Sequence, residues 1–215
     1  MSKYINKLEQ IVLASSNLGK SKEIQTAFNA FNLNIKIINQ SELNISSCEE
    51  PYNSFIENAL IKARHASKQS NLPALADDSG LCIPYIDNLP GVSSAHWADD
   101  NNFAQDIPNK DKRNNLYLEY QLKNNLLTIE QRKAYYYCVL VFIHQAQDPC
   151  PIIVYEKFQG ILQLDARGTK GFGYDPYFYI PSLNKTAAEL DILEKNKISH
   201  RGKAIKKLIY ELKDI

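Results

Sequence analysis

Short apolar runs with strand character alternate along this chain with segments whose apolar positions recur at helical spacing. Residues 11–14 and 35–38 predict strands, and the stripe carried by residues 21–31 predicts a helix between them. A longer helical stripe follows Ser54, which forms a capping box with Glu57, so a second helix is predicted to begin there. Strands and helices are therefore interleaved from the start of the chain.

The middle of the chain has a more broken pattern. Residues 75–76 predict a strand that ends in a turn at Asp77, Asp78, Ser79 and Gly80, after which residues 81–86 return to an extended pattern. The polar tract over residues 99–115 predicts a surface loop, and residues 116–127 predict a helix.

The last third of the chain predicts two strands followed by helices. Residues 135–144 and 152–158 are rich in β-branched and aromatic residues, and they predict paired strands joined over residues 148–151. Thr186 starts another capping box, and Ser199 is placed to cap a last helix. Helices interleaved with strands over the whole chain predict an α/β domain with a mixed sheet.

Composition narrows the class of protein. The 215 residues, 44% hydrophobic and 23% charged, predict a single ordinary globular domain over 1–215. The 25 basic and 24 acidic side chains give a net charge of +1, which disfavours nucleic acid or an anionic membrane as a partner. Four cysteines without metal-ligand spacing, and an N-terminus without an apolar signal core, predict a cytoplasmic protein with reduced thiols.

The stretch VLASSNLGKSKE has half of a phosphate-binding P-loop. A P-loop needs glycine five positions before its Gly-Lys-Ser, and Ala14 stands there instead. A strand, a loop and a helix N-terminus still favour an anion site, with Lys20 as an added charge. The alternative is that Asn17 only caps the helix and Lys20 lies in solvent.

Two acidic pairs are candidates for metal chemistry. Glu49 and Glu50 precede the helix at Ser54, and Asp77 and Asp78 follow a strand. Carboxylates from separate loops suit Mg²⁺, which fills its remaining positions with water and phosphate. Neighbouring strand residues point to opposite faces, so one aspartate is expected to be catalytic and the other structural. The alternative for each pair is a solvated turn.

Basic and aromatic residues complete the candidate set. Lys62 lies one turn after Asn58 and could reach a phosphate; otherwise it is a surface lysine. In GFGYDP, Phe172 stands between two glycines and could stack on a flat ligand, with core packing as the alternative. His200 and Arg201 begin the last helix, where cations oppose the helix dipole, so an anion or a carbonyl oxygen is expected beside them.

Six segments in register resemble the non-standard purine nucleoside triphosphate pyrophosphatases, the Ham1-like family of inosine and xanthosine triphosphatases. They are VLASSNLGKSKE, SFIENALIKARHA, LPALADDSGL, LPGVSSAHWA, GTKGFGYDPYF and KTAAELDILEKNKISHRGKA, and they cover nearly the whole chain. The resemblance implies an elongated mixed sheet flanked by helices, with two lobes around a central cleft, and a homodimer. It also implies Mg²⁺-dependent cleavage of ITP, dITP and XTP to the monophosphate and pyrophosphate, which clears these purines from the nucleotide pool.

The resemblance also implies residue roles. Glu50 and Asp78 would hold the metal, and Asp78 would be the general base. The residues that would bind the purine nucleoside triphosphate are Ser15, Ser16, Asn17, Leu18, Gly19, Lys20, Lys62, Ser79, Phe172, Gly173, Tyr174, Asp175, Lys195, His200 and Arg201.

Two positions depart from the family pattern, and two other functions are considered. Ser16 stands where glycine is common, so a positive φ there would strain the loop, and His96 stands where arginine or lysine is usual. The alternatives are a pyrophosphatase for modified pyrimidine nucleotides and a nucleotide-binding regulator without turnover. Glu50, Asp78 and Lys20 together favour an enzyme, because binding alone needs no base.

Overall fold

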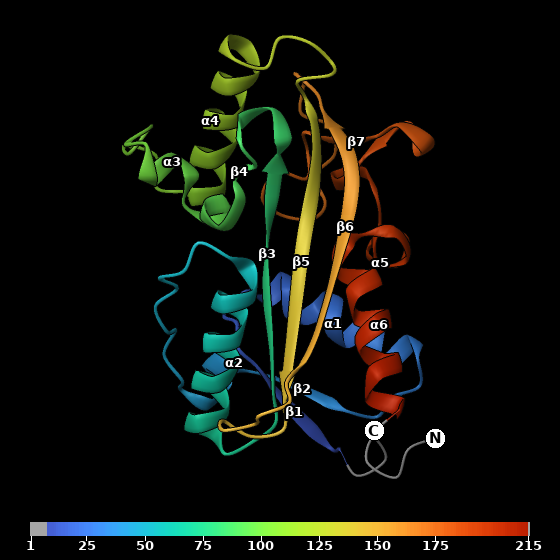
Figure 1. Ribbon diagram of the computed structural model, residues 1–215. Coiled ribbons are helices and arrows are strands. Elements are labelled where there is room, and N and C mark those ends of the chain that lie inside the picture. Colours follow the sequence, from blue (N-terminus) through green and yellow to red (C-terminus); the bar gives the residue numbers. More distant parts are fainter. Residues whose placement is uncertain (1–7, 215) are drawn as a thin grey trace. The chain divides into compact units, whose positions relative to one another are not determined.

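The computed structural model describes residues 8–214, in which strands and helices alternate along the chain (Figure 1). The elements, in chain order, are β1 (Gln10–Leu13), α1 (Leu18–Ala30), β2 (Lys36–Asn39), α2 (Phe55–Ser70), β3 (Ala74–Ile83), β4 (Leu89–Pro90), α3 (Trp97–Asp100), α4 (Lys110–Asn124), β5 (Lys133–Ile143), β6 (Ile152–Leu162), β7 (Phe178–Ile180), β8 (Lys185–Thr186), α5 (Ile192–Ile198) and α6 (His200–Asp214).

The described strands form one mixed sheet of eight strands in the hydrogen-bonded order β2-β1-β3-β5-β6-β7-β8, with β4 paired to β3. β1 runs parallel to both β2 and β3, in a register that pairs Leu13 with Asn39 and with Leu75. The pairs β3–β4, β6–β7 and β7–β8 are antiparallel. The predicted α/β class with a mixed sheet is confirmed.

The described chain divides into two compact units, each made of segments that are distant in sequence. The first contains the described residues up to Asp78, together with Cys138–Glu156 and residues 196–214. The second contains Ser79–Tyr137 and Lys157–Lys195. The prediction of one pyrophosphatase domain over 1–215 stays a prediction.

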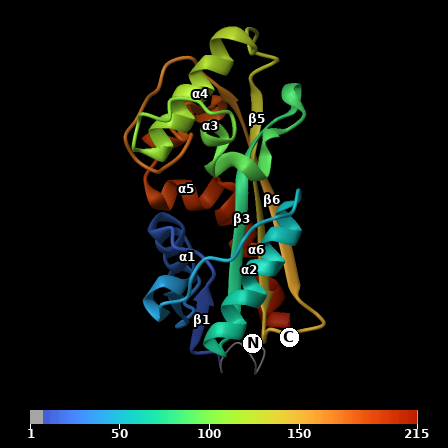
Figure 2. The same ribbon diagram turned by 90° about the vertical axis from the view of Figure 1, so that its left-hand side faces the viewer.

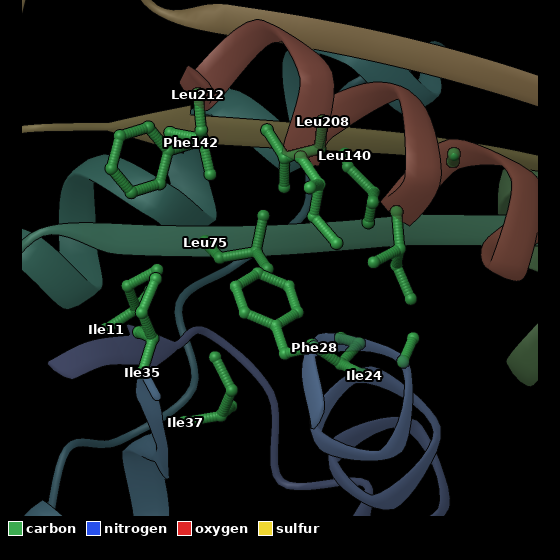
Figure 3. Packing of buried hydrophobic residues seen from close by; sticks show 14 of the residues in the cluster. Ile11, Ile24, Phe28, Ile35, Ile37, Leu75, Leu140, Phe142, Leu208 and Leu212 are labelled. Atoms are coloured by element: carbon green, nitrogen blue, oxygen red, sulfur yellow. The ribbon is translucent and has the colours of Figure 1, made fainter. Parts of the chain in front are cut away.

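The first unit has an aliphatic core between its strands and two helices. Ile24 and Phe28 of α1 and Leu208 of α6 are fully buried and meet Leu75 of β3 in one cluster (Figure 3). Burying a side chain of this size contributes about 1.5–3 kcal/mol. Figures 1 and 2 show α2 on the other face of these strands, where its buried alanines allow close packing.

The second unit has a core that is richer in aromatic rings. The ring of Phe178 packs 4.6 Å from that of Tyr136 and 5.3 Å from that of Phe158, measured between centroids. Trp97 of α3 contacts Tyr117 of α4 edge to face, with centroids 4.9 Å apart. Offset and edge-to-face contacts of this kind are the arrangements that aromatic rings prefer.

Local capping signals predicted several helix starts correctly. Ser54 is the N-cap of α2 and accepts a hydrogen bond from the Glu57 amide at 3.3 Å, although Glu57 accepts from the Ser54 hydroxyl and not from its amide as a full capping box requires. Ser199 accepts from the Gly202 amide at 3.1 Å at the start of α6. The Thr186 box is present as well, although it begins a single 3₁₀ turn, Ala187–Glu189, rather than an α-helix.

Two predictions from the sequence are wrong. No turn interrupts the chain at Asp77, Asp78, Ser79 and Gly80; β3 runs straight through them because Leu81, Cys82 and Ile83 are buried and β3 pairs along its length with β1, β4 and β5. The polar tract over 99–115 is helical at both ends, where α3 ends and α4 begins. Asn109 caps α4, and the buried Asn114 accepts from the Ala98 amide at 2.9 Å, a tertiary contact that polar composition conceals.

Candidate functional site

In the first unit, the loop between β1 and α1 ends in a capped helix start. Asn17 is the N-cap of α1, and its side chain accepts from the Lys20 amide at 3.1 Å. Ser15 accepts from the Asn17 amide at 3.1 Å, which folds the loop back on itself. The helix therefore begins at Leu18, three residues before the predicted start. Ser16 is not among the described residues with positive φ, so the strain considered for this position is absent.

The Lys20 side chain turns inward from this helix start. Its ammonium Nζ lies 2.5 Å from Asp77 Oδ1 and 3.4 Å from the Asp77 carbonyl oxygen, and the side chain is 16% exposed. The cap proposed for Asn17 is real, but the alternative that Lys20 lies in solvent is wrong. A buried carboxylate on β3 holds this lysine in place.

Asp77 also holds the first turn of α6. Arg201 donates from Nε to Asp77 Oδ2 at 2.6 Å, and its Nη1 is paired with Glu23 of α1. The anion expected beside the cationic start of α6 is therefore supplied by the protein itself, from β3 and α1. His200, the first residue of α6, is buried as well.

The charges around Asp77 set its ionisation. Burial by itself would raise the pKa of Asp77, but the charges and hydrogen bonds of Arg201 and Lys20 hold that pKa well below its usual range. The Cys138 Sγ lies 3.5 Å from Asp77 Oδ2, and burial and this carboxylate raise the pKa of the thiol. Asp77 is therefore an ionised carboxylate at neutral pH inside the fold.

Asp78 lies in a different environment, because successive strand residues point to opposite faces of a sheet. Its Oδ1 accepts from Lys62 Nζ at 2.7 Å, and Lys62 also donates to Glu50 Oε2 at 2.8 Å. Asp78 Oδ2 is buried and has no hydrogen-bond partner among the described residues. Burial raises the pKa of Asp78 to about 6, although Lys62 opposes this shift.

Helix α2 places Lys62 in this position. Lys62 and Asn58 lie one turn apart on the same helix face, and Asn58 accepts from the Tyr52 amide at 3.0 Å and donates to the Tyr52 carbonyl at 2.9 Å. Asn58 thus fixes the segment that follows Glu50. With 12% of its side chain exposed, Lys62 is no surface lysine, and that alternative is wrong.

Both lysines reach the same backbone group. Lys62 Nζ lies 3.2 Å from the Asp77 carbonyl oxygen, the atom that Lys20 Nζ also approaches. Two ammonium groups from different helices therefore converge on one point of β3, next to Asp78. Held close together, two such charges favour a ligand with several negative oxygens.

The second unit contains the aromatic candidates. Gly171 (φ +79°) and Gly173 (φ +59°), which flank Phe172, have a left-handed backbone that glycine adopts without strain. Asp175 Oδ2 accepts from the Phe172 amide at 3.0 Å and from Lys195 Nζ at 2.7 Å. A Cβ on Gly171 would stand 2.1 Å from the same oxygen, so only glycine fits there.

Phe172 is half-buried, and Lys195 Nζ lies 5.0 Å from its ring centroid. Tyr174 is buried and donates to the Ser94 carbonyl at 2.8 Å. Asp111 of α4 accepts from the Gly173 amide at 3.1 Å. The loop is thus fixed on three sides, while Ser79 lies half-buried on β3 in the same unit.

Sequence reasoning missed two side chains that hold these groups in place, Glu23 and Asp111, and considered Cys138 only as a reduced thiol. It expected one of Asp77 and Asp78 to be structural, and Asp77 is the one that pairs with Lys20 and Arg201. One signal could have indicated Glu23: it lies one helical turn before Ala27, and a charged residue on an apolar helix face often has a buried partner. His96 stands where the family usually has arginine or lysine. Lys110 Nζ lies 2.7 Å from His96 Nδ1, so a positive charge is present beside this histidine.

Over residues 8–214, no group of three or more His, Cys, Asp or Glu side chains is arranged to hold a metal ion. Glu50 and Asp78 therefore stand as a pair of carboxylates rather than a complete cage. In the same part of the chain, no helix is both long and apolar enough to cross a bilayer.

Comparison with known proteins finds relatives along nearly the whole chain. Curated relatives named dITP/XTP pyrophosphatase include that of Nitrosomonas europaea, 45% identical over 207 residues (96% of each chain), and that of Burkholderia pseudomallei, 46% identical over 206 residues (96% of this chain and 94% of that one).

Solved structures agree as well. The HAM1 protein of Coxiella burnetii matches with a TM-score of 0.83 at 41% identity, covering 97% of this chain and 100% of that one. The Ham1 protein of Staphylococcus aureus matches with a TM-score of 0.76 at 32% identity, covering 96% and 99%. The model of the Ham1 family matches residues 11–211, and the chain belongs to that family.

Proposed function

We propose that this chain, a nucleoside triphosphate pyrophosphatase of the Ham1 family, hydrolyses ITP, dITP and XTP to the nucleoside monophosphate and pyrophosphate with Mg²⁺, and so cleanses the nucleotide pool. The observation that carries the proposal is the convergence of Lys20 and Lys62 on the Asp77 carbonyl beside Asp78. Two cations next to a carboxylate of raised pKa provide a polyphosphate site with a base. The names of the relatives support the choice of substrates.

Glu50 and Asp78 are the residues that would hold Mg²⁺. They fit a hard cation because both offer carboxylate oxygens, and Asp78 Oδ2 is buried without a hydrogen-bond partner in the described part of the chain. Bound Mg²⁺ would supply positive charge that stabilises the phosphate oxygens of the transition state.

Asp78 would act as the general base. Its raised pKa of about 6 leaves it ionised at neutral pH yet basic enough to accept a proton from the attacking water. The water oxygen would bond to the α-phosphorus, and the bond from that phosphorus to the bridging oxygen would break, releasing pyrophosphate. Lys20, Lys62 and the amides of Ser15, Ser16, Asn17, Leu18 and Gly19 would bind the leaving phosphates.

The remaining candidate residues of each unit are proposed to bind the nucleoside. Phe172 would stack on the purine, with Gly173, Tyr174, Asp175, Lys195 and Ser79 around the nucleoside. His200 and Arg201 would donate to the 6-oxo oxygen of hypoxanthine or xanthine. Adenine has an amino group at that position and would leave donors unpaired, at a cost of about 1–3 kcal/mol.

The deciding experiment is product analysis after incubation with ITP, dITP, XTP and the standard nucleotides, with and without Mg²⁺. We expect monophosphate and pyrophosphate from the deaminated purines only, and only with Mg²⁺. Orthophosphate release or equal attack on ATP and GTP would contradict the proposal. Turnover restricted to modified pyrimidine nucleotides would indicate the related pyrophosphatase, and binding without turnover would indicate a regulator.

Replacing Asp78 with Asn tests the mechanism. Losing a general base typically lowers kcat by about 10²–10⁴-fold, and we expect a loss of this size while most of the affinity for ITP is retained. A variant that turns over ITP like the wild type would contradict the role of Asp78 as the base.

We propose that the protein is a homodimer. Light scattering after size-exclusion chromatography tests this by measuring the molecular mass in solution. We also propose a cytoplasmic location, in keeping with the free state of Cys48, Cys82, Cys138 and Cys150, and cell fractionation tests it.

A further inference from the structure

The ammonium group of Lys62 lies between the two carboxylates that would hold the metal. Its Nζ is 2.8 Å from Glu50 Oε2 and 2.7 Å from Asp78 Oδ1, and it joins β3 to the segment that precedes α2. Burial opposes the charge of Lys62, but Asp78 and Glu50 raise its pKa, so the bridging group is a cation.

The neighbouring lysine has a different partner. Lys20 pairs with Asp77, which Arg201 also binds, and neither Lys20 nor Arg201 forms an ion pair with Glu50 or Asp78. Among the described residues, Lys62 is the one cation within ion-pair distance of Glu50 and Asp78. The direct ion pairs of these two carboxylates are therefore made by one side chain, while Lys20 acts on Asp78 without forming an ion pair with it.

We infer that Lys62 competes with the divalent cation for Glu50 and Asp78, so that the free protein binds the metal weakly and the triphosphate strengthens metal binding by drawing the ammonium away. The inference rests on the proposed function for the identity of the metal ligands. An ammonium group paired with both carboxylates and a metal ion bound by the same carboxylates would lie close together, and their like charges repel each other.

The size of the effect depends on how often Lys62 bridges the two carboxylates. The apparent affinity for the metal is the intrinsic affinity multiplied by the fraction of time without the bridge, so a bridge formed for nine tenths of the time weakens metal binding about tenfold. Because coupling between two ligands is reciprocal, a metal that displaces Lys62 also frees that ammonium for phosphate. Metal and nucleotide would then assist each other's binding through this one side chain.

The test measures the binding of Mg²⁺ alone, and of Mn²⁺ alone, to the full chain without nucleotide, by calorimetry and by the electron paramagnetic resonance of free Mn²⁺. We expect Lys62→Met to bind either ion about tenfold more tightly than the wild type. Lys62→Arg keeps the charge and should bind as weakly as the wild type. Lys20→Met, the control, removes a charge that acts on Asp78 without forming an ion pair with it, so its gain in metal affinity should be smaller than that of Lys62→Met.

Equal or weaker binding by Lys62→Met would overturn the inference, as would a gain of the same size in Lys20→Met. The absence of metal binding in every variant would overturn it too. ITP hydrolysis by the wild type is measured separately, so failure of the competition and failure of the proposed function give different results.

A second measurement uses the unchanged protein and does not depend on the folding of a variant. Acetylation of lysine amines by acetic anhydride is followed residue by residue by peptide mass spectrometry. Saturating Mg²⁺ should raise the acetylation rate of Lys62 relative to that of Lys20, because the displaced ammonium loses two ion pairs. An unchanged ratio would overturn the inference.

Discussion

Asp77 and Asp78 are chemically identical neighbours with opposite pKa shifts. Arg201 and Lys20 hold the pKa of Asp77 well below its usual range in spite of burial, whereas burial raises the pKa of Asp78 to about 6. The alternation of a β-strand separates them, because it turns one carboxyl toward α1 and α6 and the other toward α2. A structural carboxylate with a lowered pKa and a carboxylate with a raised pKa can therefore stand side by side.

Asp77→Asn should lower the free energy of unfolding by about 3–5 kcal/mol at neutral pH, because it leaves the buried Arg201 short of a partner. A carboxyl whose folded pKa is lowered stabilises the fold above its unfolded pKa of about 4 and loses this contribution as pH falls through the folded value. The gap between wild type and Asp77→Asn in urea unfolding should therefore narrow below about pH 4.

Asp78→Asn is the matched comparison, measured with EDTA present. Folding disfavours the ionised form of Asp78. The protonated carboxyl therefore stabilises the fold relative to the ionised one below about pH 4, and this stabilisation is lost as pH rises through about 6. Asp78→Asn should thus be at least as stable as the wild type at pH 8. A loss as large as that of Asp77→Asn would contradict the assignment of opposite roles.

Phe172→Ala should raise the KM for ITP and change kcat much less. Stacking of a base on an aromatic ring contributes about 1–3 kcal/mol, which corresponds to about 5- to 150-fold in KM. Phe172→Trp keeps a flat ring and should restore most of the affinity in steady-state assays. Equal KM values for all three proteins would exclude this ring from base binding.

At the scale of elements, α2 links helix stability to the site because the helix carries Lys62. Its start depends on Ser54, whose hydroxyl accepts from the Glu57 amide and donates to Glu57 Oε2 at 2.6 Å. The same helix uses Asn58 to fix the segment after Glu50. Helix α2 therefore positions Lys62 and the segment that carries Glu50, one of the two carboxylates with which Lys62 pairs.

Ser54→Ala should destabilise the protein by about 1 kcal/mol, the usual effect of removing an N-cap side chain. Urea unfolding measures the change, and the exposed Ser182→Ala provides the control, which should leave stability within about 0.5 kcal/mol of the wild type. Equal stability of the two variants would show that the cap of α2 contributes nothing.

At the scale of the whole molecule, charge and coverage point to a small-molecule enzyme. Relatives match nearly the entire chain, and the 25 basic and 24 acidic side chains almost cancel. Charges in the proposed site are matched locally, by Asp77 for Lys20 and by Glu50 and Asp78 for Lys62. Anion binding therefore depends on this arrangement and not on a global field.

We accordingly expect no mobility shift of duplex DNA at physiological salt, and no inhibition of ITP hydrolysis by added DNA. Inorganic triphosphate is the positive control, and it should inhibit because it offers the oxygens that Lys20 and Lys62 would bind. Inhibition by DNA at low concentration would contradict the view that this protein has no nucleic-acid partner.

Local rules were sufficient to predict much of this protein. Caps at Ser54 and Ser199 depend on residues three positions apart, and the paired strands β5 and β6 depend on two β-rich runs joined by a short loop. The family followed from motifs in register. Each of these signals acts over short stretches of backbone, where side-chain type and spacing limit the available conformations.

Only the tertiary structure decided which charged residues pair with one another. Asp77 meets Arg201 from 124 positions away, and Arg201 meets Glu23 from 178 positions away. The turn predicted at Asp77 to Gly80 gave way to β3, because pairing with neighbouring strands and burial outweigh the local preference of Asp, Ser and Gly for turns. Contacts between distant residues depend on packing of the whole fold, which no local pattern contains.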